Sequence, residues 1–220
     1  MPNNKLVIGF DGPSSSGKGT IARMIASHFS LDYLNTGALY RKLAFEALKA
    51  GLDLEKDEYS IINLIKKMDI SDLESDQIHN EEIGKSASII AKNQNIRFAL
   101  LYLQKEFANS KRGSVLDGRD IGTVICPNAD YKFFITASLE ERTNRRYLQL
   151  LKRNPNVSKQ VIFEQLQERD FRDQNRSASP LTIAKDAVII DNSQLKIEEV
   201  FQKVLNYINF NPKNDKSTKN

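Results

Sequence analysis

Near the start of this chain stands the segment Gly12-Pro13-Ser14-Ser15-Ser16-Gly17-Lys18-Gly19-Thr20, from which the fold can be predicted. It follows the apolar run 6–10 and precedes a helical pattern over 21–29. A glycine-rich turn between a strand and a helix points backbone N–H groups at phosphates, and the helix adds the positive end of its dipole. Lys18 supplies a mobile charge for the outer phosphates. The segment therefore predicts a nucleoside triphosphate site, and its flanks disfavour the alternative of a flexible Gly/Ser loop.

The residue after Lys18 departs from the commonest form of this motif. Gly19 stands where Ser or Thr is usual, and Thr20 comes one place later. The departure weakens the expectation that a side-chain hydroxyl ligates Mg²⁺ directly. We predict that Mg²⁺ is held through ATP and water. The G-K-G-T form is similar to that of nucleoside monophosphate kinases.

Length and charge limit the classes of protein to consider. A chain of 220 residues can form one α/β core with inserted segments. Its 32 basic and 28 acidic residues are interspersed and leave a net charge of +4. A nucleic-acid partner is not implied, because arginines that meet a nucleotide's phosphates, or a solvated mixed surface, account for this excess equally well.

The single cysteine, Cys126, cannot form an intramolecular disulfide, and no signal-peptide pattern opens the chain. We therefore expect a cytoplasmic, reduced setting. The apolar runs are of strand length, so no membrane span is expected. Cys126 is interpreted as a small buried hydrophobe rather than a nucleophile. His28 and His79 are too sparse for a metal site.

Strand-length apolar runs alternate with helical segments along the chain, which predicts an α/β fold. The runs lie at 6–10, 32–34, 114–116, 131–135 and 187–190. Such runs predict a parallel five-stranded sheet with helices on both faces and with ligands at the carboxyl ends of its strands. Helical patterns cover 86–107, 138–153 and 158–175. The polar stretch 51–85 is interpreted as a more mobile insert, and 211–220 as a disordered tail.

Three groups of residues are candidates for binding the second substrate. The first is Asp117-Gly118-Arg119-Asp120, directly after a predicted strand. Arg119 can form a fork onto a phosphate, and the carboxylates can accept hydrogen bonds from a base or orient metal-bound water. An ordinary polar turn is the alternative.

The second and third groups are arginine stripes on predicted helices. Helical spacing places Arg169, Arg172, Asp173 and Arg176 on one face. Such a stripe is unfavourable unless it faces an anion, although ion pairing on a solvated face would also explain part of it. Arg142, Arg145 and Arg146 repeat the pattern, and they either close over the donor or pair with Glu141 and solvent.

The motifs together resemble those of the bacterial cytidylate kinase family over residues 5–210. They are G-P-S-S-S-G-K-G-T, N-T-G-A-L-Y-R at 35–41, L-D-G-R-D-I-G-T-V at 116–124, A-S-L-E-E-R-T-N-R-R at 137–146, and E-R-D-F-R-D-Q-N-R at 168–176. Their order and spacing carry the resemblance. It implies a P-loop kinase fold with a core (1–40, 98–140 and 177–210), a nucleoside-monophosphate-binding insert (41–97) and a lid (141–176).

The resemblance also implies roles for individual residues. Ser88, Arg97 and Asp120 match positions that read cytosine, and Arg169 and Asp173 match positions around the ribose. Tyr40, Arg41, Arg119 and Arg176 match positions around the acceptor phosphate, and Thr36 replaces a serine that is frequent there. Residues 12–20 with Arg145 and Arg146 would bind ATP, and Lys18, Arg119 and Arg176 would be catalytic. The insert is shorter than usual and carries His79 where an arginine is common, which argues against the small sheet of the family's insert.

The expected activity is transfer of the γ-phosphoryl group from Mg·ATP to CMP, and also to dCMP, by a monomer that binds neither nucleic acid nor membrane. No general base is needed, because the acceptor is a phosphate oxygen that is anionic at neutral pH. One alternative is a kinase for another nucleoside monophosphate or small acceptor. Another is a nucleotide-binding switch or nucleic-acid-binding protein without small-molecule transfer.

Overall fold

The computed structural model describes residues 5–70, 73–152 and 154–212. Its centre is a parallel sheet with the strand order β2-β3-β1-β4-β5. The strands are β1 (Val7–Asp11), β2 (Asp32–Asn35), β3 (Ser114–Gly118), β4 (Tyr131–Thr136) and β5 (Val188–Asp191). The five predicted strands are confirmed, each displaced by no more than two residues at its ends.

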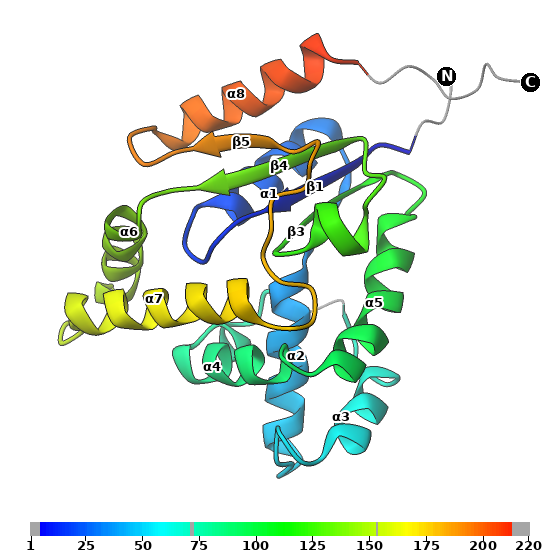
Figure 1. The fold of residues 1–220 in the computed structure, drawn as a ribbon, viewed down its shortest axis with the longest axis vertical. Helices are drawn as coiled ribbons and strands as arrows, with labels where there is room; N and C mark the ends of the chain where they lie inside the picture. Colours follow the sequence, from blue (N-terminus) through cyan, green and yellow to red (C-terminus); the bar gives the residue numbers. More distant parts are fainter. Residues whose placement is uncertain (1–4, 71–72, 153, 213–220) are drawn as a thin grey trace, which may run out of the picture.

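Helices bury both faces of the sheet (Figure 1). On one face α1 (Lys18–Phe29) and α8 (Ile197–Phe210) pack side chains such as Ile25 and Val204 against Phe10 and Phe133. On the other face α2 (Thr36–Lys49) and α5 (Gln94–Ala108) contribute to a second cluster with Leu116. Burial on both faces explains why the strands read as continuous apolar runs.

The region below the sheet in Figure 1 is helical. It contains α3 (Glu58–Ile65), the short 3₁₀ turn η1 (Asp76–Ile78) and α4 (Glu81–Ile90), followed by α5. No strand occurs in the described parts of the insert, 41–70 and 73–97, as the short insert suggested. The amphipathic segment 86–107 spans two helices, because Asn93 starts α5 by accepting the N–H groups of Asn95 and Ile96.

Two helices that pack against each other, α6 (Leu139–Leu151) and α7 (Lys159–Asn175), follow β4. Ser138 and Ser158 cap these helices with their hydroxyls, so the predicted helices at 138–153 and 158–175 are confirmed, except that position 153 is outside the described part. The predicted tail largely falls outside it as well. Asn211, its first residue, is held because its carbonyl accepts a hydrogen bond of 2.6 Å from the Tyr131 hydroxyl.

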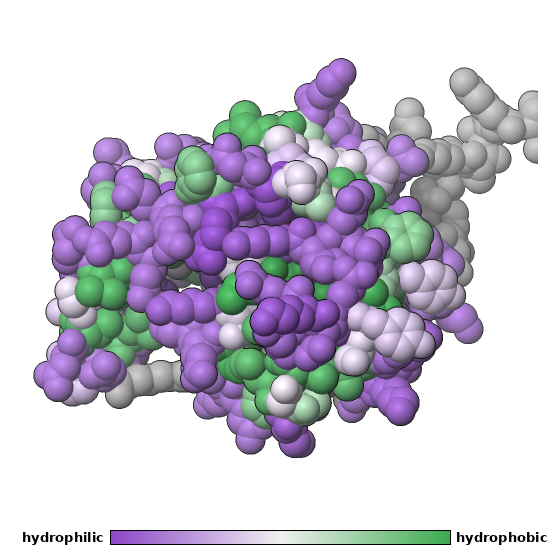
Figure 2. All heavy atoms as spheres, turned by 60° about the horizontal axis from the view of Figure 1, so that its bottom comes forward, coloured by the Kyte–Doolittle hydropathy of each residue, from purple (hydrophilic) through white to green (hydrophobic). Residues whose placement is uncertain are grey.

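The hydrophilic character of the surface agrees with the basic and acidic residues being interspersed along the sequence. Hydrophilic residues cover most of the face drawn in Figure 2, and hydrophobic residues are exposed in patches between them. None of the helices within the described ranges combines the length and apolar character needed to span a membrane.

Candidate active site

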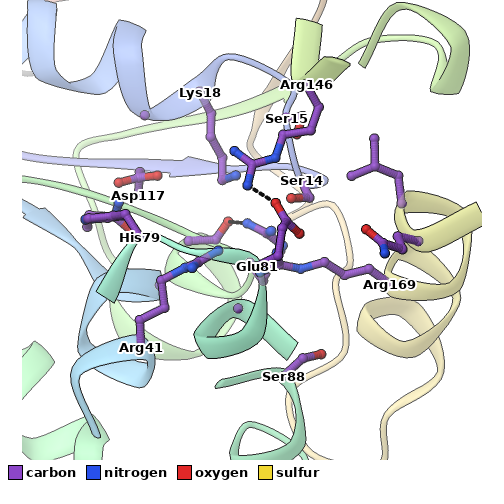
Figure 3. A pocket seen from close by; sticks show the side chains of 18 of the residues that line it. Ser14, Ser15, Lys18, Arg41, His79, Glu81, Ser88, Asp117, Arg146 and Arg169 are labelled. Atoms are coloured by element: carbon purple, nitrogen blue, oxygen red, sulfur yellow. Dashed lines mark hydrogen bonds and ion pairs between the residues drawn. The ribbon is translucent and has the colours of Figure 1, made fainter. Parts of the chain in front are cut away.

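A cleft of about 600 Å³ opens at the carboxyl ends of β1 and β3. Its walls come from the loop after β1, the start of α2, α4 and α7. Figure 3 shows Lys18, Arg41, Arg146 and Arg169 reaching the same space from different elements. The cleft therefore gathers cations that lie far apart in the sequence.

The glycine-rich loop has the backbone that a phosphate cradle requires. Gly12 has φ 146°, and a side chain there would lie 2.0 Å from the Ile135 carbonyl oxygen, so only glycine fits. Ser15 and Gly17 also have positive φ, and α1 begins at Lys18. The N–H groups of the loop thus lie at a helix N-terminus.

Lys18 is buried at the floor of this loop, and its Nζ donates to the Pro13 carbonyl at 3.2 Å. Burial first, and then the charge of Arg119, lower the pKa of Lys18 to about 7. A phosphate at this position would stabilise the protonated lysine. The buried carboxylate of Asp117 is nearby and accepts a hydrogen bond of 2.7 Å from the Tyr33 hydroxyl.

The arginines at the centre of the cleft are held in different ways. Arg119 donates through Nε to Asp173 at 2.8 Å, and Arg41 donates to the carbonyls of Ile78 and Asn80. Arg169 has no hydrogen bond or ion pair with any described residue, and its Nε is buried. Burial, followed by the charge of Arg119, lowers the pKa of Arg169 to about 10. These guanidinium groups suit an anion between them.

A smaller pocket of about 60 Å³ adjoins the cleft. Asp120 forms a buried ion pair with Arg97, and its Oδ1 lies 4.0 Å from Nη2 of Arg176. The Arg97 guanidinium stacks over the Tyr40 ring at 5.4 Å. The predicted acceptor residues that line this pocket are Thr36, Tyr40, Ser88, Arg97, Arg119, Asp120, Arg169, Asp173 and Arg176.

Arg176 reaches this pocket by a route that helical spacing did not predict. α7 ends at Asn175, and Arg176 is extended, so the prediction that all members of its stripe lie on one helix face is wrong for Arg176. The chain turns because the Leu181 N–H donates to the Asp173 carbonyl at 2.7 Å, while Arg176 Nε donates to the Ser179 carbonyl. Arg172 stays on the helix, lines the cleft, and lies 3.9 Å from Glu168.

The arginines of α6 pair with carboxylates, and two of them also contact the phosphate loop. Arg145 pairs with Glu141 at 2.8 Å and also donates to the Ser16 carbonyl of the phosphate loop. Arg146 pairs with Glu81 across the cleft, as the dashed line in Figure 3 marks. Arg142 is buried, pairs with Asp170 at 2.7 Å and donates to the Ser14 carbonyl.

A second cleft of about 490 Å³ lies on the outer side of the phosphate loop, between α6 and the start of α8. Asn192 lines it and was missed by the sequence reasoning, although it follows β5 at the carboxyl end, where ligand residues are expected. Its Nδ2 donates to the Ser16 carbonyl at 2.8 Å, and its Oδ1 accepts from Arg145 at 2.9 Å.

Comparison with known proteins identifies the family. The family model described as cytidylate kinase matches residues 8–210. The chain belongs to the cytidylate kinase family. A cytidylate kinase of Bartonella bacilliformis is 46% identical over 198 residues, covering 90% of this chain and 92% of the relative. One of Azorhizobium caulinodans is 44% identical over 201 residues, covering 91% and 96%.

The resemblance to cytidylate kinases inferred from the motifs is thus confirmed. Among solved structures, an uncharacterized protein from Eubacterium ventriosum superposes with a TM-score of 0.54 at 13% identity, covering 94% of this chain and all of that one. At this identity the match supports the fold alone.

Cys126 and His79 were predicted to have no chemical role in this cytidylate kinase, and the structure places His79 in the lining of the main cleft. Cys126 is buried, and burial raises the pKa of its thiol to about 11, which agrees with a packing role. His79 contacts the Leu73 carbonyl through Nε2 at 2.9 Å. Within the described residues, no group of three or more His, Cys, Asp and Glu side chains could hold a metal ion.

Proposed function

We propose that this protein transfers the γ-phosphoryl group of ATP to CMP, and to dCMP, to give the diphosphate. The observation that carries the proposal is the meeting of two pockets at a shared pair of arginines. Arg119 and Arg169 line both the phosphate-loop cleft and the small pocket that contains Asp120. Two anionic nucleotides can therefore lie end to end, and membership of the cytidylate kinase family supports this arrangement.

The small pocket has the polar groups that cytosine requires. The N4 amino group is a donor suited to the Asp120 carboxylate, and N3 and O2 are acceptors suited to Arg97 and to the Ser88 hydroxyl. Uracil would place a carbonyl oxygen against Asp120 and leave buried polar groups unpaired, at a cost of roughly 1–3 kcal/mol or more. Arg169 and Asp173 would hold the ribose, and Tyr40, Arg41, Arg119 and Arg176 the acceptor phosphate.

Catalysis would be mainly electrostatic. Residues 12–20 with Arg145 and Arg146 would hold ATP, with Lys18, Arg119 and Arg176 placed to stabilise the charge that spreads over the transferred group. The main obstacle to transfer is the repulsion between the donor and acceptor phosphates when they are placed in line, and fixed cations reduce this repulsion. The acceptor oxygen is already anionic. These residues therefore need to orient the two phosphate groups and neutralise their charge, and they need not remove a proton.

Mg²⁺ would enter with ATP. The site fits this, because Asp117 offers a buried carboxylate beside Lys18 that can accept hydrogen bonds from metal-bound water, and Mg²⁺ usually keeps several of its waters. Bound there, Mg²⁺ would shield the repulsion between phosphates. We further propose that 41–97 is the acceptor-binding insert and 141–176 the lid of a cytoplasmic monomer that does not bind nucleic acid.

A coupled ADP-release assay with CMP, dCMP, UMP and AMP tests the proposed function. CMP and dCMP should be the preferred acceptors, and Lys18→Ala should lower kcat by about 100-fold or more, because one charge on the transferring group is lost. Circular dichroism of the variant should match that of the wild type. Faster turnover of UMP or AMP would assign another acceptor. Slow hydrolysis that does not respond to CMP, with salt-sensitive nucleic-acid binding, would indicate a different class of protein.

A further inference from the structure

Asp11 is the last residue of β1, and its buried carboxylate reaches the turn that carries Asp120. Its Oδ1 accepts the N–H of Ile121 and its Oδ2 that of Gly122, both at 2.8 Å. These residues begin η2 (Ile121–Ile125), a short π-helix. The first N–H groups of a helix have no partner within it. Asp11 therefore caps η2 from a strand 110 residues away in the sequence.

Asp120 stands at the N-cap position of η2, yet its side chain makes no capping hydrogen bond. An aspartate at this position ordinarily turns its carboxylate back onto the N–H of the second or third helical residue. Here Asp120 directs its carboxylate to Arg97 and Arg176 instead. Asp11 already satisfies the N–H of Ile121 and that of Gly122, which is one of the two N–H groups that an N-cap aspartate ordinarily bonds.

We propose that Asp11 is a positioning residue that keeps the Asp120 carboxylate turned into the acceptor pocket, and that it thereby sets the selectivity for the acceptor base. This inference rests on the proposed function, in which Asp120 reads cytosine. Without Asp11, the unsatisfied N–H groups of η2 would draw the Asp120 carboxylate back onto its own helix. Arg97 would then lose its ion-pair partner, and cytosine would lose the acceptor for its N4 amino group.

The burial of Asp11 supports a need for a carboxylate at this position. Burial raises the pKa of Asp11 to about 6, while the backbone hydrogen bonds oppose this shift. A neutral side chain would be easier to bury, but only a carboxylate offers an acceptor oxygen to each of two N–H groups. Asp11 also directly precedes Gly12, so a single residue joins the phosphate loop to the acceptor turn.

β1 provides a matched control at its opposite end. The Oδ2 of Asp130 accepts the Val7 N–H at 2.8 Å, so Asp130 supports the same strand through the same kind of hydrogen bond. It does not line the cleft or the smaller pocket. A general loosening of β1 should follow from Asp130→Asn as well as from Asp11→Asn, whereas a change in base selectivity should follow only from the latter.

The test measures kcat and KM with CMP, UMP and ATP for the wild type, Asp11→Ala, Asp11→Asn and Asp130→Asn, together with the melting temperature of each. For Asp11→Ala we expect the KM for CMP to rise about tenfold and the kcat/KM preference for CMP over UMP to fall about tenfold. The KM for ATP should stay within about twofold of the wild-type value. Asp11→Asn, which keeps one acceptor oxygen, should give an intermediate preference. Asp130→Asn should lower the melting temperature and keep the wild-type preference.

If Asp11→Ala does not fold, the kcat/KM preference of Asp11→Asn for CMP over UMP is the test of the inference. A wild-type preference for CMP over UMP in Asp11→Asn would overturn the inference, and so would an equal loss of preference in Asp130→Asn. Failure of the wild type to phosphorylate CMP would instead overturn the proposed function, and the inference with it.

Discussion

At the scale of single residues, the site holds an arginine that is not paired with any residue the structure describes. Arg169 is the clearest case, since its guanidinium is surrounded by Arg119 and Arg41 and has no ion pair within the described structure. Its contact with Asp173 is only a through-space attraction. A residue kept in this state is expected to favour ligand binding at the expense of stability.

We predict that Arg169→Met stabilises the protein in the absence of nucleotides by about 1–2 kcal/mol, because it removes a half-buried, unpaired charge. The same change should raise the KM for CMP by about tenfold or more. Urea unfolding and steady-state kinetics measure the two effects. Arg172→Met is the matched control from the same helix and should leave stability nearly unchanged, because Arg172 already lies near Glu168. A less stable Arg169→Met protein would mean that Arg169 is held by contacts that outweigh the burial of its charge.

At the scale of helices, α4 and α6 are joined across the mouth of the cleft by the ion pair of Glu81 with Arg146. Arg146 also lines the second cleft, beside the phosphate loop. Under the proposed role of Arg146 in binding ATP, Glu81 would compete with the ATP phosphates for this arginine. The pairing of α4 with α6 is a consequence of packing rather than of either helix alone.

Glu81→Gln should therefore lower the KM for ATP by about two- to fivefold, the size expected for loss of a partly exposed ion pair. Initial-rate kinetics at varied ATP and saturating CMP measure this change, and its size should shrink at high salt. Glu82→Gln is the control, because Glu82 is the exposed neighbour in the same first turn. A higher KM for ATP in Glu81→Gln would show instead that the pair helps to form the ATP-binding arrangement.

At the scale of the whole molecule, Lys18 is affected by several parts of the chain at once. Burial, followed by the charges of Arg119 and Arg169, lowers its pKa to about 7, against the opposing charges of Asp117 and Asp173. The unfolded chain keeps a lysine pKa near 10.5. Between these two values the unfolded state binds more protons than the native state, so the free energy of unfolding must rise with pH.

We predict that the wild type, without nucleotide, gains unfolding free energy relative to Lys18→Met as the pH rises from about 7 to about 9, by at most about 1.4 kcal/mol per pH unit. Below the folded pKa both states are protonated, and the difference should level off. Urea unfolding across this pH range measures it. Lys56→Met, which changes an exposed lysine, should follow the wild type throughout. A parallel course for the wild type and Lys18→Met would contradict a depressed pKa for Lys18.

The sequence by itself determined the phosphate loop, the five strands and the capped helices α6 and α7. These depend on local signals: a glycine that no other residue can replace beside Ile135, continuous apolar runs, and serines at helix starts. The motifs also placed Ser88, Arg97 and Asp120 together, and all line one pocket.

Only the tertiary structure decided which partners these residues meet. Asp11 caps a helix 110 residues away, and Asn192 reaches the Ser16 carbonyl across 176 residues. Arg176 leaves α7 because the Leu181 N–H donates to the Asp173 carbonyl. In a sequence, a charged residue on a solvated face and one that meets a partner from another strand look alike, because the distinction depends on how helices pack against the sheet.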